Sequence, residues 1–191
     1  MLKRLSDKIY GVTNRYTISA LTALFCLYVF WILPNSADVD RIIGTGAALI
    51  VPFFKYLLYT PGDFYGQLDA YGEAGRQAFV NYRLLQATLW LLTLGSFLAL
   101  ATSALLKSFV PPASAVRQLN LVALMPSLFD FLENKLQIVL VLLYPQRFDG
   151  LAVLAAGFTA IKWITLLAAF IILLYAIVRA SAVKLTGRTA S

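Results

Sequence analysis

An apolar segment over residues 120–144 is long enough to cross a lipid bilayer, yet it carries charged side chains in its middle. A spanning helix needs about 20 mostly apolar residues, and an ionised side chain at the bilayer centre costs at least ~2.5–3.5 kcal/mol on insertion scales. Charges inside a membrane therefore face the interior of a helix bundle or a cavity. This requirement restricts the chain to folds in which other helices surround the segment.

The polar residues of this segment recur at helical spacing. Positions i, i+3, i+4 and i+7 of an α-helix lie on one face. The residues that share this face are Ser127, Asp130, Glu133, Asn134 and Gln137. We predict that they form a polar stripe through an otherwise apolar helix. They are our candidates for a ligand-binding or ion-binding site.

A further charge, Lys162, lies inside the next apolar segment, residues 151–178, and only the short connection 145–150 joins the two segments. Measured from the middle of that connection, Glu133 and Lys162 are each about fourteen residues away, which places them at the same depth of an antiparallel hairpin that rises ~1.5 Å per residue. We predict a contact between Glu133 and Lys162, with Asp130 as a second acceptor. Lys162 therefore belongs to the candidate site.

The composition indicates a membrane protein. Of the 191 residues, 60% are hydrophobic and 13% are charged, whereas soluble domains have about 45–50% and about 25%. We predict an all-α polytopic membrane protein, a single bundle over residues 1–191 with four transmembrane helices and an interfacial or re-entrant helical segment between the first and second. The predicted spans are 16–33, 84–106, 120–144 and 151–178, and the outside helical segment covers 42–83.

Two signals divide the outside segment. Residues 42–59 are apolar but interrupted by two glycines, a proline and a lysine, and we interpret them as lying on or re-entering the membrane. Thr60 and Pro61 then favour a helix start, because threonine is a good N-cap and proline fits the first helical turn. Gly72 is expected to end this helix, whose apolar side chains we expect to pack across the mouth of the bundle, and a new helix begins near Glu73.

Basic residues gather near both ends of the chain: Lys3, Arg4, Lys8, Arg15, Arg179, Lys184 and Arg188. By the positive-inside rule this pattern predicts an even number of spans with both termini cytoplasmic, and we assign the chain to the bacterial inner (cytoplasmic) membrane. Residues 1–16 predict an interfacial helix. A cleaved signal peptide is disfavoured at 16–33, because the apolar run is long and a poor cleavage site follows it.

Several classes of site are excluded by residue type. The chain has no histidine, which removes histidine-ligated haem, histidine-bearing zinc sites and Ser-His-Asp or Cys-His nucleophiles. The single cysteine, Cys26, has no partner for an internal disulfide. We therefore expect no cofactor and no metal. The net charge of +7 is spread over the ends of apolar runs, which favours contact with anionic membrane lipids and not with nucleic acid.

Three further charged residues need partners. Arg76 and Arg83 lie on the extension of the second predicted span, and they are candidates for contact with an anionic lipid head group or a phosphate. Lys135 lies roughly opposite Glu133 on the helical wheel. Because Lys135 then needs a partner elsewhere, we interpret it as a sign of a homo-oligomer.

The sequence leaves several functions open. The leading hypothesis is a non-enzymatic membrane protein whose charged core binds or conducts a small cation, a proton or an amphiphilic ligand. An alternative is an intramembrane proton-transfer enzyme, isomerase-like, in which Asp130 or Glu133 protonates a lipid or sterol-like substrate. Another alternative is an accessory subunit of a larger membrane complex. The plainest interpretation of the stripe is a buried lock that fixes the register of two helices.

A set of short motifs occurs in a fixed order along the chain: Thr60-Pro61, Tyr65, Leu68-Asp69-Ala70-Tyr71-Gly72, Gly75-Arg76, Phe129-Asp130, Glu133-Asn134 and Tyr144-Pro145. This order resembles that of small uncharacterised bacterial four-span integral membrane proteins. The resemblance implies that the acidic motif and the glycine-bearing turn belong together. It implies no activity and no catalytic residue.

Overall fold

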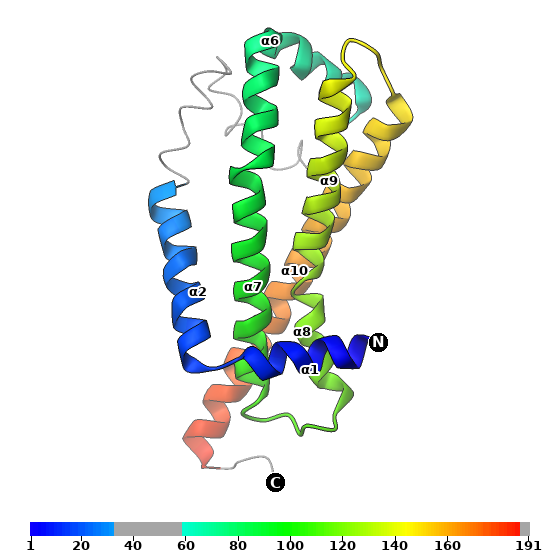
Figure 1. Cartoon of the computed structure of the whole chain (residues 1–191). Coiled ribbons are helices and arrows are strands. Elements are labelled where there is room, and N and C mark those ends of the chain that lie inside the picture. The colour runs from blue at the N-terminus through cyan, green and yellow to red at the C-terminus, as the bar shows by residue number, and fades with distance from the viewer. Residues whose placement is uncertain (33–58, 188–191) are drawn as a thin grey trace. The chain divides into compact units, whose positions relative to one another are not determined.

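A computed structural model describes residues 1–32 and 59–187, and every regular element within them is helical. The helices in chain order are α1 (Leu2–Val12), α2 (Arg15–Leu27) with a π-helical turn (Tyr28–Ile32), α6 (Pro61–Leu84), α7 (Gln86–Leu106), a 3-10 helix (Ala115–Gln118), α8 (Leu119–Val122), α9 (Met125–Leu142) and α10 (Asp149–Thr186) (Figure 1). The all-α prediction is confirmed for these residues. The predicted surface or re-entrant segment 42–59 lies outside the described residues except for Tyr59.

Two helical stretches of the described chain, Pro61–Leu106 and Asp149–Thr186, are long and apolar enough to cross a membrane. A shorter apolar helix covers Arg15–Trp31. Helix α9 has 18 residues, which is close to the required length at ~1.5 Å per residue, but it carries three charged side chains. The structure thus supports two spans by length and composition, and the prediction of four spans stays a prediction.

Helix α10 exposes large apolar side chains in a regular pattern. They recur at spacings of three and four residues, so they share one face of the helix. These residues are Ile164, Leu167, Ile171, Leu174 and Val178. Exposed apolar surface of this extent marks contact with a membrane or with another protein.

The chain forms two compact units. Unit 1 contains Met1–Phe25, Thr93–Ser127 and Ile164–Ser191. Unit 2 contains Cys26–Leu92 and Leu128–Trp163. Helices α7 and α10 each contribute residues to both units.

In unit 1, α1 packs beside α8 (Figure 1), and buried polar side chains join the two helices. Ser6 Oγ donates a hydrogen bond to Asn120 Oδ1 at 2.8 Å, and Asn120 Nδ2 donates to Ser103 Oγ at 3.0 Å. The Tyr10 hydroxyl donates to the backbone oxygen of Arg117 at 3.1 Å. Because these side chains satisfy one another, α1 is attached by specific hydrogen bonds as well as by apolar contact.

Lys107 donates hydrogen bonds to the carbonyl groups at the C-terminal end of α1. The last carbonyl groups of a helix have no partner within the helix. Lys107 Nζ donates to the backbone oxygens of Tyr10 and Thr13 at 2.8 and 2.9 Å. The chain then turns at Asn14, whose Oδ1 accepts the backbone N–H of Thr17 at 3.0 Å as α2 begins. A cation at a helix C-terminus also complements the helix dipole.

A close approach between two helices of unit 1 depends on Gly95. A Cβ atom built on Gly95 would lie 2.3 Å from Ser127 Oγ and 2.8 Å from Ser127 Cβ. Real Cβ atoms do not come so close to other atoms, so only glycine permits this contact between α7 and the first turn of α9.

In unit 2, α6 begins and bends at the positions that the sequence predicts. Thr60 Oγ1 accepts the Asp63 backbone N–H at 3.1 Å, and Asp63 Oδ2 accepts the Thr60 backbone N–H at 2.9 Å, which completes a capping box. Gly72 has φ 62° and ψ −175°, a conformation open essentially to glycine alone, and it interrupts the helix. The N-cap and the break at Gly72 are therefore confirmed.

The part of α6 before Gly72 packs on α9 and α10. Phe64, Leu68 and Tyr71 are buried in a cluster that includes Ile138 and Ala152. Their spacing of three and four residues gives this short helix one apolar side, as the sequence predicts.

Two arginine–tyrosine contacts involve α6, one on each side of Gly72. Arg147 lies 4.7 Å from the centre of the Tyr65 ring, whose hydroxyl accepts the backbone N–H of Phe148 at 2.7 Å. Arg76 lies 4.1 Å from the centre of the Tyr144 ring and donates to a backbone oxygen of its own helix. Cation–π contacts of this kind add to the apolar packing.

Candidate functional site

The candidate site lies in unit 2, where α9 turns its polar stripe inward. Glu133, Asn134 and Gln137 are 3%, 2% and 4% exposed, and the Asp130 side chain is 14% exposed. Their spacing on α9 places all four on one side of the helix, as the sequence predicts. Ser127, the fifth member of the predicted stripe, belongs to unit 1 and lies against Gly95.

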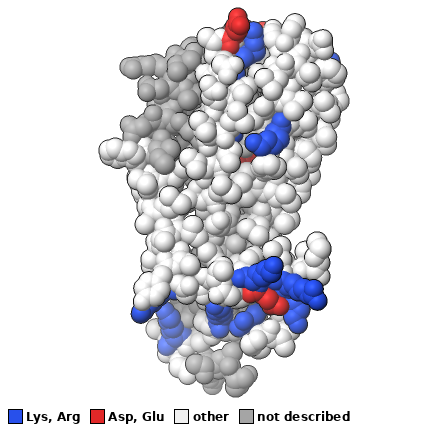
Figure 2. All heavy atoms as spheres, viewed as in Figure 1, with Lys and Arg blue, Asp and Glu red and all other residues white. Residues whose placement is uncertain are grey.

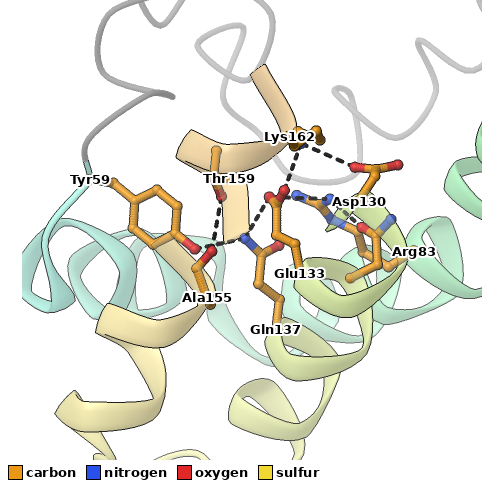
Figure 3. A network of polar contacts seen from close by, with 9 residues as sticks. Tyr59, Arg83, Asp130, Glu133, Gln137, Ala155, Thr159 and Lys162 are labelled. Atoms are coloured by element: carbon orange, nitrogen blue, oxygen red, sulfur yellow. Dashed lines mark hydrogen bonds and ion pairs between the residues drawn. The ribbon is translucent and has the colours of Figure 1, made fainter. Parts of the chain in front are cut away.

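Helix α10 supplies Lys162 to this stripe. Lys162 Nζ lies 2.6 Å from Glu133 Oε2 and 3.0 Å from Asp130 Oδ1 (Figure 3). Both contacts are within hydrogen-bond distance, so the cation bridges the two carboxylates. The predicted contact between Glu133 and Lys162, with Asp130 as a second acceptor, is present.

The second cation of the site is Arg83, from the last turn of α6. Its Nη1 donates a hydrogen bond to Asn134 Oδ1 and lies 4.0 Å from Glu133 Oε1. Its guanidinium also lies 4.9 Å from the centre of the Phe79 ring. The structure thus places Arg83 at the polar stripe. The sequence instead suggests an anionic lipid head group as the partner of Arg83 and Arg76.

Lys135, by contrast, forms none of the ion pairs that the described residues make at this site. Its Nζ lies 5.2 Å from the centre of the Phe131 ring on the same helix. The helical wheel places it away from Glu133, and the structure agrees. The four charges that meet are therefore Asp130, Glu133, Lys162 and Arg83, whose formal sum is zero. The homo-oligomer inferred from Lys135 stays a prediction.

Gln137 extends the network toward Tyr59. Its Nε2 donates to Glu133 Oε1 and to the Tyr59 hydroxyl oxygen, both at 3.1 Å. Burial raises the pKa of the Tyr59 phenol, and the charge of Glu133 adds to the rise, so the hydroxyl stays protonated at neutral pH. Thr159, next to this hydroxyl in Figure 3, donates to the backbone oxygen of Ala155 at 3.1 Å.

A cavity of about 350 Å³ opens beside this network. Its polar wall includes Arg83, Glu133, Gln137 and Lys162, and aromatic rings make up much of the rest. The aromatic residues are Tyr59, Phe64, Phe79 and Trp163. Because Phe64 comes from the part of α6 before Gly72, that part of the helix forms one side of the cavity.

Some buried polar atoms of the site have no hydrogen-bond partner. They are Arg83 Nε, Asn134 Nδ2 and Gln137 Oε1. Leaving a buried donor or acceptor unpaired costs about 1–3 kcal/mol, and most such groups in native proteins are paired. Two of these residues, Arg83 and Gln137, line the cavity.

The described residues contain no group of three or more Cys, Asp or Glu side chains that holds a metal ion. Asp130 and Glu133 are a pair, and their oxygens already contact Lys162. The site is therefore equipped for hydrogen bonding and charge compensation.

The sequence analysis does not include Tyr59 in the site, and it proposes Arg83 only as a contact for an anionic head group and not as a partner of Glu133 and Asn134. The balance of charges could have indicated Arg83. Two buried carboxylates are best compensated by two cations. Lys162 supplies one, and Lys135 cannot supply the other because it lies on the opposite side of its helix from Glu133. Tyr59 directly precedes the predicted N-cap, so its position relative to α9 depends on how α6 packs. A search with the whole chain matched no protein-family model, no curated protein and no solved structure.

Proposed function

We propose that the protein is an integral membrane protein that binds a small amphiphilic ligand in the cavity of unit 2 and catalyses no reaction. The observation that carries this proposal is the cavity of about 350 Å³ beside the buried charges of Arg83, Glu133 and Lys162. Ligand pockets have volumes of roughly 300–1,000 Å³. A lock that only fixed the helix register would need the ion pairs but not the space next to them.

The walls of the cavity favour an amphiphile. Aromatic rings supply apolar contact on one side, and the charged network supplies polar contact on the other. Binding or conduction of a cation is less well supported, because Lys162 and Arg83 already compensate both carboxylates. The isomerase-like alternative is weakened too, since each Glu133 oxygen already accepts a hydrogen bond, from Lys162 or from Gln137.

The charge distribution supports a membrane orientation with both termini in the cytoplasm. Among the described residues, unit 1 has eight Lys and Arg against one acid, a net charge of +7, whereas unit 2 has five against six, a net charge of −1. Figure 2 shows blue side chains gathered around α1 of unit 1. The positive-inside rule assigns such a basic part of the chain to the cytoplasm, where anionic lipids attract it.

Quenching of tryptophan fluorescence tests the ligand proposal directly. Trp163 lines the cavity, and replacing Trp31 and Trp90 by Phe leaves it as the only tryptophan of the 191 residues. The probe is 8-bromooctan-1-ol, because bromine quenches indole fluorescence on contact. We expect saturable quenching by the probe in detergent micelles, over the linear background that partitioning into the micelle produces.

A pair of variants on one helix supplies the control. Gln67 lines the cavity, whereas Gln77 is exposed on the same helix. Gln67→Phe fills the space and should abolish the saturable phase, and Gln77→Phe should leave it unchanged. Absence of a saturable phase in the parent protein, or its persistence in Gln67→Phe, would refute ligand binding in this cavity.

The orientation is tested with alkaline phosphatase fusions in a bacterium, since this enzyme is active only outside the cytoplasm. A fusion after Gly187 should be inactive, and a fusion after Gln146, in the connection between α9 and α10, should be active. The opposite result would reverse the proposed topology.

A further inference from the structure

Helix α9 has a second face, which is exposed and mostly apolar. Its residues recur at spacings of three and four, so they lie on one side of the helix. They are Leu128, Phe131, Val139 and Leu142, with the partly exposed Lys135 between them. Such a face requires surroundings that are apolar and that also compensate one positive charge.

The ammonium group of Lys135 points toward the middle of the predicted span 120–144. At ~1.5 Å per residue, Lys135 lies ~15 Å from the first residue of α9 and ~10 Å from the last. Side chains on a helix lean toward its N-terminus, and Lys135 Nζ lies 5.2 Å from the centre of the Phe131 ring, one turn earlier. The group is therefore directed away from the nearer end of the helix, where lipid head groups would be within closest reach.

The chain itself offers no free carboxylate at this depth. None of the ion pairs of the described residues includes Lys135. Within the four predicted spans the acids are Asp130 and Glu133, and both contact Lys162. A second copy of the chain has the same acids in the same pairs, and a two-fold interface on this face would bring one Lys135 against the other. A carboxylate for Lys135 therefore has to come from a different protein.

We propose that the exposed face of α9 binds a transmembrane helix of another protein, which carries an aspartate or a glutamate at the depth of Lys135. Charged residues inside a membrane pair with one another, and the apolar side chains around Lys135 supply packing contact along the rest of the interface. This inference rests on the membrane location under the proposed function and not on the ligand in the cavity. It replaces a second copy of the chain as the expected partner of Lys135.

The test is disulfide crosslinking to a synthetic transmembrane helix in phosphatidylcholine vesicles. The Glu helix has about 24 leucine and alanine residues, one glutamate at its centre and a cysteine one turn to either side of the glutamate. The Gln helix has glutamine in place of the glutamate. In the protein, Cys26→Ser removes the native thiol, and Val139→Cys places a new one on the exposed face, one turn from Lys135.

We expect the Glu helix to crosslink to this protein at least tenfold faster than the Gln helix. Lys135→Met should remove the difference, and Lys135→Glu should transfer the preference to a helix with a central lysine. Gly157→Cys, in place of Val139→Cys, is the control. Gly157 is exposed on α10, on the opposite side of that helix from the buried Ala155, so it should crosslink to the Glu and Gln helices equally slowly.

Equal rates for the Glu and Gln helices at Val139→Cys would overturn the proposal. Loss of the preference when phosphatidylglycerol replaces part of the phosphatidylcholine would overturn it too, because Lys135 would then be assigned to a lipid head group. Flotation with the vesicles after a carbonate wash reports membrane insertion. A protein that does not insert contradicts the proposed membrane location, whereas insertion without the preference contradicts the partner alone. Neither result bears on the cavity, which the quenching of Trp163 tests.

Discussion

Removal of Lys162 should destabilise the protein strongly. Lys162→Met leaves Asp130 and Glu133 without the cation that contacts them at 3.0 and 2.6 Å, and Glu133 is 3% exposed. Breaking a buried pair by removing one partner costs ~3–5 kcal/mol. Because Arg83 remains 4.0 Å from Glu133 and compensates part of the lost charge, we expect the lower end of this range, about 3 kcal/mol.

The double change should recover much of this loss. Glu133→Leu alone leaves two cations against one carboxylate, so we expect a loss similar to that of Lys162→Met. Together the two changes restore a net charge of zero and replace the pair by apolar side chains, which is often near neutral in a buried position. We therefore expect the double loss to be smaller than the sum of the single losses by about 2–3 kcal/mol.

The measurement is reversible unfolding in mixed micelles of dodecyl maltoside and sodium dodecyl sulfate, followed by circular dichroism. Lys135→Met is the matched control, because it removes a lysine on α9 whose Nζ lies over the Phe131 ring. It should cost less than about 1 kcal/mol and should add to Glu133→Leu without coupling. Additive losses for Lys162→Met and Glu133→Leu, within ~0.5 kcal/mol, would refute the coupling.

Three further predictions use the same unfolding assay. Gly95→Ala should destabilise the protein by about 1–3 kcal/mol, because the added Cβ would collide with the side chain of Ser127. Gly157→Ala on α10 is the control: no atom lies within 4 Å of its added Cβ, so it should be neutral or stabilise by up to ~1 kcal/mol. Equal effects of the two changes would contradict the close approach at Gly95. Gly72→Ala should also cost about 1–3 kcal/mol, through its φ of 62° and not through contacts, and an unchanged midpoint would count against the kink. Burial raises the pKa of Tyr10 from 10.0 to about 12, against the opposing effect of Arg117. The folded state therefore holds this proton more tightly than the unfolded chain does. The contribution of Tyr10 to the free energy of unfolding should be complete below pH 10 and should be lost as the pH rises to about 12. The Tyr10→Phe variant should lack this part of the pH dependence, and an identical pH profile in both proteins would refute the assignment.

The contact between Glu133 and Lys162 follows from the sequence because a short connection fixes the register of two antiparallel helices. The position of Arg83 does not follow from the sequence in this way. Arg83 contacts Asn134, which lies 51 residues later in the sequence, and a connection of that length does not fix the register between the two helices. Arg83 also precedes the predicted span 84–106, so the sequence predicts a lipid head group and not a buried carboxylate as its partner.

The N-cap at Thr60 and the break at Gly72 are local, and local chemistry predicts them well. The cavity is not local. Its walls combine rings from the end of α6, such as Phe79, with Trp163 on α10, and no periodicity in either helix reports the space that remains between side chains. The sequence also does not predict that Gln137 Oε1 is unpaired, because this depends on which side chains lie around the amide in the folded protein.

Because Lys107 caps α1 from far along the sequence, α1 cannot be capped until long after it has been synthesised. Lys107 follows Tyr10 by 97 residues, and Asn120 follows Ser6 by 114. At ~5–20 residues per second, a ribosome needs roughly 5–20 s to make the intervening chain. During that interval the final carbonyl groups of α1 have only solvent or lipid head groups as partners. Helix α1 therefore reaches its final contacts only after Lys107 and Asn120 have been synthesised, and a nascent chain that stops before Lys107 carries α1 without its cap.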